Sequence, residues 1–253
     1  MTVVIENFRI DRIPVLEITQ KGAPEHLPLV ILIHGWTGRK EDVLFFAYFL
    51  AVRGYVVVSM DAFGHGERAL KEGWTVEAFS NLLLQTSDDI NRVIAHYEKD
   101  PRVDVSRVGL SGISMGGVIT YYYLTREDKR IRAAVPMIAT PDFTSLINSQ
   151  NSEEILRMLG QEGKDITADV TLGVIMAMQP SQKMHLMTSV PLLMLNGTSD
   201  PLIDLEGVRQ FYQNIKPLYK DPEAVKLIEY EGVTHYTPYE MQVDAFNWFQ
   251  KYV

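Results

Sequence analysis

The sequence predicts an α/β fold, in which a mostly parallel β-sheet lies between layers of helices. Along the chain, short segments rich in valine, isoleucine and leucine alternate with segments whose apolar residues recur at helical spacing. In the middle, Gly112-Ile113-Ser114-Met115-Gly116 sets a serine between two glycines, directly after a strand-like segment and before a helical one. Strands that alternate with helices in this way are typical of parallel sheets.

The strands follow from local patterns, taken in chain order. Alternating apolar and polar residues indicate strands covered on one face, and continuous apolar runs indicate buried strands. The expected strands are Val3–Ile10, Ile13–Gln20, Leu29–Ile33, Tyr55–Met60, Arg107–Ser111, Ile131–Met137, Val190–Gly197 and Val225–Tyr230. The first two have no helix between them, so we expect them to form an antiparallel pair at the start of the sheet.

Helical periodicity separates most of the later strands. The longest helix is indicated where Phe79, Ile90 and Tyr97 share an apolar face and Asp89 and Arg92 take the opposite one. The expected helices cover residues 41–53, 79–97, 118–124, 205–215 and 238–252. A glycine directly follows the first of them, as is common at helix ends.

Residues 141–189 interrupt this alternation. They combine polar linkers, such as Asn148–Ser152, with apolar segments, such as Gly173–Met178. This pattern predicts a small helical lid. We therefore expect one domain over residues 1–253, with a cap inserted at 141–189.

Ser114 is the candidate nucleophile. A sharp turn from strand to helix strains the backbone at the serine, and the small residues Gly112 and Gly116 leave room for it. The hydroxyl is then exposed at the carboxyl end of the sheet, above the positive end of the following helix. The alternative is that Ser114 only caps that helix after a tight turn.

A serine hydroxyl needs a base to take its proton and a carboxylate to orient that base. Where the serine lies in a sharp turn between a strand and a helix, the acid and then the histidine follow it along the chain. Asp200 and His235 each lie just past a later predicted strand, so they should meet Ser114 at the carboxyl edge of the sheet. Asp204 lies close enough to compete with Asp200 for the acid role, and His235 could instead be a structural loop histidine.

Two backbone amides are candidates for an oxyanion hole, which stabilises the charge that forms when serine attacks a carbonyl. One is the amide of Trp36, because the strand before it runs into His34-Gly35 and the glycine lets the backbone turn. The other is the amide of Met115, the residue after the candidate nucleophile. His34 and a second glycine-flanked histidine, His65, are expected to be loop braces rather than proton carriers.

These residues carry a family resemblance. The chain resembles the α/β-hydrolase superfamily and, within it, the small bacterial carboxylesterases of the dienelactone-hydrolase and prolyl-oligopeptidase-like branch. The segments that carry the resemblance are His34-Gly35-Trp36, Asp61–Glu67, Gly112–Gly117 and Asn196–Ile203, together with His235. It spans nearly the whole chain and is weakest over residues 141–189, and it implies an α/β-hydrolase fold and ester hydrolysis. Dienelactone hydrolases proper use a cysteine nucleophile, whereas this chain has no cysteine.

Composition excludes several classes of function. Apolar residues make up 46% and charged residues 22% of the 253 residues, as in an ordinary globular protein. The net charge of −8 and the lack of a basic cluster argue against nucleic-acid binding. The longest apolar run, Val43–Val52, is too short to span a membrane. With no cysteine and no signal peptide at Met1–Asn7, we expect a cytoplasmic protein.

Together the patterns predict a serine hydrolase that cleaves small, short-acyl carboxylic esters through an acyl-enzyme intermediate. No spacing indicates a metal site, and no cofactor is expected. The methionines near the lid could line an adaptable acyl pocket, with Met176 and His185 in its wall. Two alternatives stay open: a peptidase or amidase of the same branch, and a non-catalytic member of the fold that binds a small ligand. The sequence predicts no oligomeric state.

Overall fold

The sheet is built from eight strands. The computed structural model describes residues 2–71, 74–143, 173 and 176–253. The strands are β1 (Val3–Ile10), β2 (Ile13–Gln20), β3 (Leu27–Ile33), β4 (Val56–Met60), β5 (Val103–Ile113), β6 (Ala133–Met137), β7 (Leu192–Gly197) and β8 (Val225–Tyr230). Their order across the sheet is β1-β2-β4-β3-β5-β6-β7-β8.

The first two strands differ in direction from the rest of the sheet. β1 pairs with β2 and β2 pairs with β4 in antiparallel register, whereas every pairing from β4 to β8 is parallel. β4 lies beside β3 on one side, and β5 lies beside β3 on the other side. Loops after β3 and β5 therefore diverge at a switch point, where open sheets of this kind bind their ligands.

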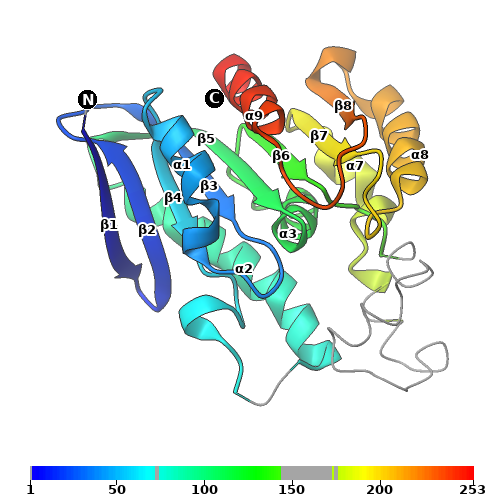
Figure 1. The fold of residues 1–253 in the computed structure, drawn as a ribbon, viewed down its shortest axis with the longest axis horizontal. Helices are drawn as coiled ribbons and strands as arrows, with labels where there is room; N and C mark the ends of the chain where they lie inside the picture. Colours follow the sequence, from blue (N-terminus) through cyan, green and yellow to red (C-terminus); the bar gives the residue numbers. More distant parts are fainter. Residues whose placement is uncertain (1, 72–73, 144–172, 174–175) are drawn as a thin grey trace.

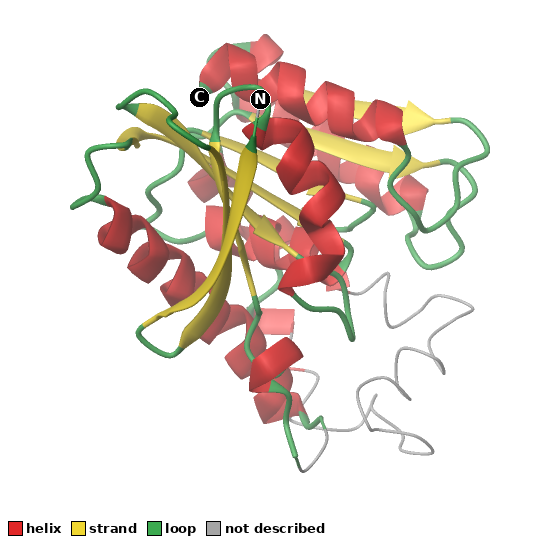
Figure 2. Cartoon of the chain, turned by 60° about the vertical axis from the view of Figure 1, so that its left-hand side comes forward, coloured by secondary structure: helices red, strands yellow, loops and turns green. Residues whose placement is uncertain are grey.

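Helices cover both faces of the sheet (Figures 1 and 2). The helices used below are α1 (Leu44–Ala51), α2 (Val76–Tyr97), α3 (Met115–Leu124), α7 (Met184–Met187), α8 (Leu205–Ile215) and α9 (Tyr239–Tyr252). One apolar core packs α1 and α9 on the sheet, and a second packs α2, α3 and α8 on the opposite face. Because both faces are covered, the parallel strands β4, β6 and β7 are buried along their whole length, as their largely apolar sequences predict.

Most of the expected elements are confirmed. The α/β-hydrolase fold class holds, and the bounds of β1, β2, β8 and α8 match the sequence-based ranges. The antiparallel start is confirmed by the pairing of Val3 with Gln20 and of Ile10 with Ile13. Gly54, with φ of 92°, ends the turn after α1 rather than following the helix directly, since the helix ends at Ala51.

Several other elements differ from the expected bounds by a few residues, and two of these expectations were wrong for a reason that the structure shows. The expected helix over residues 41–53 is a 3-10 turn at Lys40–Val43 followed by a shorter helix, α1, because Asp42 turns back to accept a hydrogen bond from the Arg39 amide. Strand β5 begins at Val103 rather than Arg107. Its first residues pair with Leu27 and Pro28 before a register shift in β3, which periodicity alone does not reveal.

Much of the expected lid lies outside the described residues. The residues that lie outside include Asn148–Ser152 and Ile175. A cap over residues 141–189 therefore stays a prediction. Within the part of the chain that the structure describes, no helix is long and apolar enough to cross a membrane.

Candidate active site

Ser114 lies in the sharp turn between β5 and α3. Its φ and ψ of 54° and −114° place this serine in a backbone region that non-glycine residues rarely adopt. A β-carbon added at Gly112 would lie 2.0 Å from the Gly116 carbonyl oxygen, so only glycine fits there. The Ser114 amide donates to the Met137 carbonyl on β6 at 2.9 Å. The fold thus holds the strained turn from both sides.

Ser114, His235 and Asp200 form a continuous chain of hydrogen bonds. The Ser114 Oγ lies 2.8 Å from His235 Nε2, and His235 Nδ1 lies 2.8 Å from Asp200 Oδ2. With the ring proton on Nδ1, the imidazole donates to the carboxylate and accepts from the serine hydroxyl. The three side chains come from the loops after β5, β7 and β8, at the same edge of the sheet.

The Asp200 carboxylate is fixed on its second oxygen as well. Its Oδ1 accepts from the amides of Leu202 and Ile203 at 2.9 and 3.2 Å, and its side chain is 1% exposed. Asp204, the competing acid, instead caps α8 by accepting from the Glu206 amide at 3.2 Å. The structure therefore brings Asp200, and not Asp204, to the histidine.

The loops that carry the acid and the histidine are joined by their backbones. The Ser199 amide donates to the Val233 carbonyl at 3.0 Å, and the Thr198 amide donates to the Tyr230 carbonyl at 3.0 Å. The Thr198 hydroxyl also accepts from the Gly232 amide at 2.9 Å. These bonds set the distance between Asp200 and His235 through the main chain.

The loop after β3 lies directly beside the serine. A β-carbon added at Gly35 would lie 3.8 Å from the Ser114 Cβ and 3.6 Å from the Ile113 carbonyl oxygen. Trp36, whose amide is an expected oxyanion donor, follows at once. Met115, whose amide is the other, is the first residue of α3. Met115 thus follows Ser114 directly in the chain, and Trp36 follows Gly35, which lies close to Ser114 in space.

Two buried histidines stand between the loops after β3 and β4. His34 Nδ1 lies 2.7 Å from the Gly35 carbonyl oxygen, and His34 Nε2 accepts from the Ala62 amide at 3.1 Å. His65 Nδ1 lies 3.1 Å from the Phe63 carbonyl oxygen. Burial lowers the pKa of both histidines, that of His65 to about 4. They contact backbone rather than the Ser114–His235 pair, as expected of braces.

Sequence reasoning did not single out Trp74, which completes an aromatic cluster here. The Trp74 ring lies 4.5 Å from the Trp36 ring and 4.8 Å from the His65 ring, centre to centre. The Trp36 and His65 rings meet edge to face at 5.0 Å. A tryptophan in a loop before a helix carries no periodic signal, so only the fold reveals its partners.

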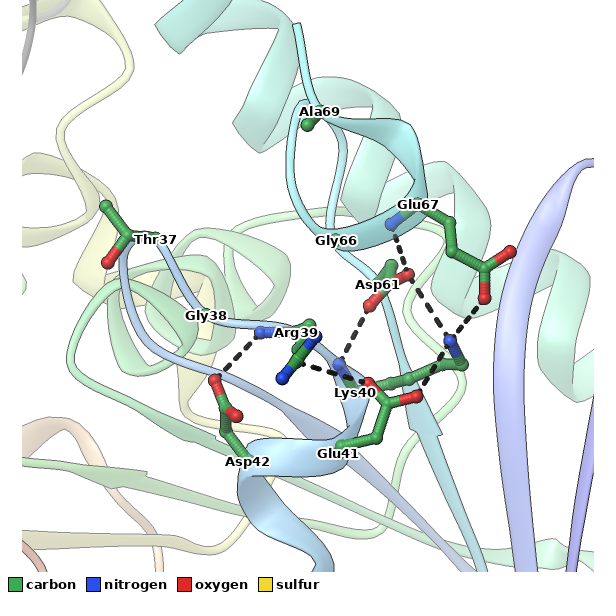
Figure 3. Close-up of a pocket in the computed structure, with 10 residues that line it drawn as sticks. All are labelled: Thr37, Gly38, Arg39, Lys40, Glu41, Asp42, Asp61, Gly66, Glu67 and Ala69. Carbon is green, nitrogen blue, oxygen red and sulfur yellow. Dashed lines mark hydrogen bonds and ion pairs between the residues drawn. The ribbon is translucent and has the colours of Figure 1, made fainter.

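A group of buried charges was also missed. Lys40 and Asp61, both almost fully buried, lie 3.7 Å apart, and the Lys40 Nζ also contacts Glu41 at 3.1 Å and Glu67 at 2.5 Å (Figure 3). The signal that could have found it is a charged residue, Asp61, at the end of a continuous apolar strand. These side chains border a cavity of about 580 Å³ that none of Ser114, Asp200 and His235 lines.

The expected pocket residues lie farther along the chain. Met176 is half-buried and packs against the core that holds α2 and α3, whereas His185 is exposed on α7. Much of the chain between them and the sheet is outside the described residues, so their place in a pocket stays a prediction. Among the described residues, no group of histidine, aspartate and glutamate side chains is arranged to hold a metal ion.

Comparison with known proteins places the chain in a family. The sequence pattern of the Dienelactone hydrolase family matches residues 13–237, which includes every residue of the candidate site. The chain belongs to this family. As a member of a hydrolase family with relatives named esterases, it is an enzyme.

Two relatives have esterase names, and a solved structure shares the fold. A Bacillus subtilis (strain 168) protein named "Putative esterase YitV" is 32% identical over 98% of this chain and 99% of its own length. Esterase YjfP of Escherichia coli (strain K12) is 25% identical, with the same two coverages. In fold, the chain resembles an acylaminoacyl peptidase of Pyrococcus horikoshii, with a TM-score of 0.77 at 19% identity over 99% of this chain and 41% of the peptidase.

Proposed function

We propose that this protein is a serine esterase that hydrolyses short-acyl carboxylic esters through a covalent acyl-enzyme. The observation that carries the proposal is the unbroken chain from Ser114 through His235 to Asp200, with both hydrogen bonds at 2.8 Å. A structural serine or histidine has no need of a base on one side and a buried carboxylate on the other. The family and the esterase names of the relatives support the same reaction class.

In the first half of the reaction, the Ser114 Oγ bonds to the ester carbonyl carbon while its proton moves to His235 Nε2. Asp200 stabilises the imidazolium that results. The amides of Trp36 and Met115 donate to the oxyanion of the tetrahedral intermediate. The bond from carbon to the alcohol oxygen then breaks, and Nε2 returns the proton to the leaving alcohol, which leaves an acyl group on the serine.

In the second half, water replaces the alcohol. It attacks the acyl carbonyl carbon and gives its proton to His235 Nε2. As the intermediate collapses, the bond to Ser114 Oγ breaks and the oxygen recovers its proton from Nε2. The products are a carboxylic acid, an alcohol and the free enzyme, so no cofactor is consumed.

Substitution of the proposed nucleophile, Ser114, tests this reaction. Ser114→Ala should fold normally and lose several orders of magnitude in turnover, on the order of the loss seen when a triad serine is removed. A fluorophosphonate probe should label the wild-type enzyme at Ser114 and leave the variant unlabelled. A purified variant that keeps its esterase activity would remove the serine from the mechanism. An unlabelled wild-type protein would favour the non-catalytic, ligand-binding alternative.

The short-acyl preference rests on chemistry and on one half-buried residue. Esters offer a better leaving group than amides, so they react with less help from substrate positioning. Met176 packs half-buried near the core, and a flexible thioether suits an adaptable acyl wall, where we also place His185. We expect acetyl to hexanoyl esters to give the highest kcat/KM. Peptide amides reacting faster than these esters would favour the peptidase alternative, and a preference for long acyl chains would show a different pocket.

A further inference from the structure

The carbonyl oxygen of Gly35 is held by two donors. His34 Nδ1 lies 2.7 Å from it, and the amide of Gly38 donates to it at 3.1 Å. The second bond closes a tight turn over Gly35–Gly38, in which Thr37 has a φ of 58°. This conformation is unfavourable for a β-branched residue, so the turn needs support from outside its own four residues. His34 supplies that support.

The partners of His34 settle its tautomer. Its Nε2 faces the Ala62 amide at 3.1 Å, and an amide can only donate, so Nε2 must carry the lone pair. The single proton of the neutral ring then lies on Nδ1, where it is donated to Gly35. The ring is fully buried, and burial holds its pKa below the usual range although Asp61, Asp42 and Glu41 act in the opposite direction.

The orientation of the Gly35 carbonyl fixes the next amide. In a trans peptide the C=O and the following N–H point in opposite directions, and the described residues contain no cis peptide. The amide of Trp36 therefore points away from the side on which His34 and Gly38 hold the Gly35 oxygen. Gly35 itself lies beside Ser114, so this direction matters for an anion formed on the serine.

We propose that His34 is a positioning residue, which aims the Trp36 amide at the oxyanion by donating from Nδ1 to the carbonyl of Gly35. The inference rests on the proposed serine-esterase function and deepens it. His34 touches no reacting atom. Its effect passes through one peptide plane, and it depends on which ring nitrogen carries the proton.

The frame around His34 is rigid enough for this role. Asp61 Oδ1 accepts from the Lys40 amide at 2.8 Å, and Oδ2 accepts from the Glu67 amide at 2.9 Å (Figure 3). A β-carbon at Gly66 would lie 2.3 Å from the Asp61 carboxylate, so the loop after β4 is packed closely on it. Asp61 thus ties the loops after β3 and β4 together, and the Ala62 amide stays opposite His34.

Two variants separate the two nitrogens of the ring. In His34→Asn the side-chain amide nitrogen can take the place of Nδ1 and donate to the Gly35 carbonyl, but nothing reaches the Ala62 amide. In His34→Gln the side-chain oxygen can take the place of Nε2 and accept from Ala62, but the donor to Gly35 is lost. Each variant removes one hydrogen bond. If His34 contributed only to stability, the two substitutions would therefore change kcat to a similar extent.

The experiment compares kcat, KM and thermal unfolding of the two variants with the wild type on one short-acyl ester. Loss of a whole oxyanion donor costs about 10²–10³ in kcat, so a misaimed donor should cost about tenfold to a hundredfold. We expect that loss in His34→Gln, with KM changed by less than about threefold, and most of the wild-type kcat in His34→Asn. Equal kcat in the two variants, or a larger loss in His34→Asn, would overturn the proposal.

A measurement on the unaltered protein covers the case in which a variant fails to fold. Nitrogen-15 NMR of the histidine rings distinguishes a protonated from an unprotonated ring nitrogen. The proposal requires that His34 carry its proton on Nδ1 at neutral pH, and a spectrum with the proton on Nε2 would contradict it.

The experiments distinguish failure of the positioning role of His34 from failure of the proposed serine-esterase function. Activity in Ser114→Ala would refute the serine mechanism whatever His34 does. An inactive Ser114→Ala protein beside His34→Asn and His34→Gln enzymes of equal kcat would refute only the positioning role.

Discussion

Gly197 and Val233 are in backbone contact: a β-carbon added at Gly197 would lie 2.1 Å from the Val233 carbonyl oxygen. Gly197 ends β7, just before the loop that carries Asp200, and Val233 precedes His235 in the loop after β8. The approach of the two loops is thus set by the absence of a single side chain. The distance between the carboxylate and the imidazole depends on it.

The first prediction concerns this contact. Gly197→Ala should force the two loops apart and destabilise the protein by about 1–3 kcal/mol or more, as overpacking typically does. The atom that the new β-carbon would meet belongs to the backbone and not to a flexible side chain. Urea unfolding would measure the loss. Gly35→Ala is the matched control, since its new β-carbon would meet only ordinary contacts at 3.6 and 3.8 Å. Equal stability of the two variants would contradict the contact.

A second prediction separates the two acids near His235. Asp200→Asn should lower kcat on the order of thousands-fold, because the amide cannot hold the imidazole in the required tautomer. Asp204→Asn should keep near wild-type kcat, because asparagine caps a helix about as well as aspartate does. Steady-state kinetics on one ester test both. A reversed order of effects would make Asp204 the functional acid.

The third prediction is a dependence of folding stability on pH that arises at His65. Burial lowers its pKa to about 4, and in the unfolded chain the pKa returns to about 6.5. Between these values the unfolded state binds the proton more tightly, so stability falls as the pH decreases through this window. Above it the residue is neutral in both states and has no effect. The loss from about pH 7 to pH 4 should be on the order of 3 kcal/mol.

Urea unfolding of His65→Asn at several pH values would measure this contribution. Asparagine can still donate to the Phe63 carbonyl oxygen, but it does not titrate. The variant should therefore lose less stability than the wild type on acidification, whereas His185→Asn, a change at an exposed residue, should follow the wild-type curve. Parallel curves for His65→Asn and the wild type would show that this histidine does not cause the dependence.

The fourth prediction concerns the buried lysine. Lys40→Met should destabilise the protein by about 3 kcal/mol, because it leaves the buried Asp61 carboxylate without its cation. Arg209→Met removes an ion pair to Glu229 that is open to solvent, and it should destabilise the protein far less than Lys40→Met does. Chemical denaturation at neutral pH compares the two. A similar loss of unfolding free energy in the two variants would contradict the prediction, because it would mean that Lys40 is as well solvated as Arg209.

Sequence patterns predicted the fold and the residues that the structure brings together, because both depend on local signals. The Gly112–Gly116 turn and the polar residues after apolar strands can be recognised without knowledge of the tertiary structure. The contacts of Lys40 with Asp61 and of Trp74 with Trp36 could not be predicted in this way. They join loops from different strands, and nothing in either segment alone specifies its partner.

The choice between Asp200 and Asp204 shows the same limit. Both acids lie in one loop, and both are suitable residue types. The structure separates them because Asp200 is turned inward by the amides of Leu202 and Ile203, while Asp204 faces the first turn of α8. Such a distinction rests on backbone direction within a few residues, which a sequence pattern does not encode.

The first turn of α3 touches β3 without any side chain between them: a β-carbon at Gly116 would lie 2.3 Å from the Ile33 carbonyl oxygen and 2.8 Å from that of His34. The helix that follows the serine and the strand that leads to Trp36 therefore move as one piece. Side-chain substitution cannot adjust their spacing, since main chain meets main chain. Substitutions that change the substrate range of this protein are therefore expected among the side chains around the reacting centre, and not in the contact of Gly116 with Ile33 and His34.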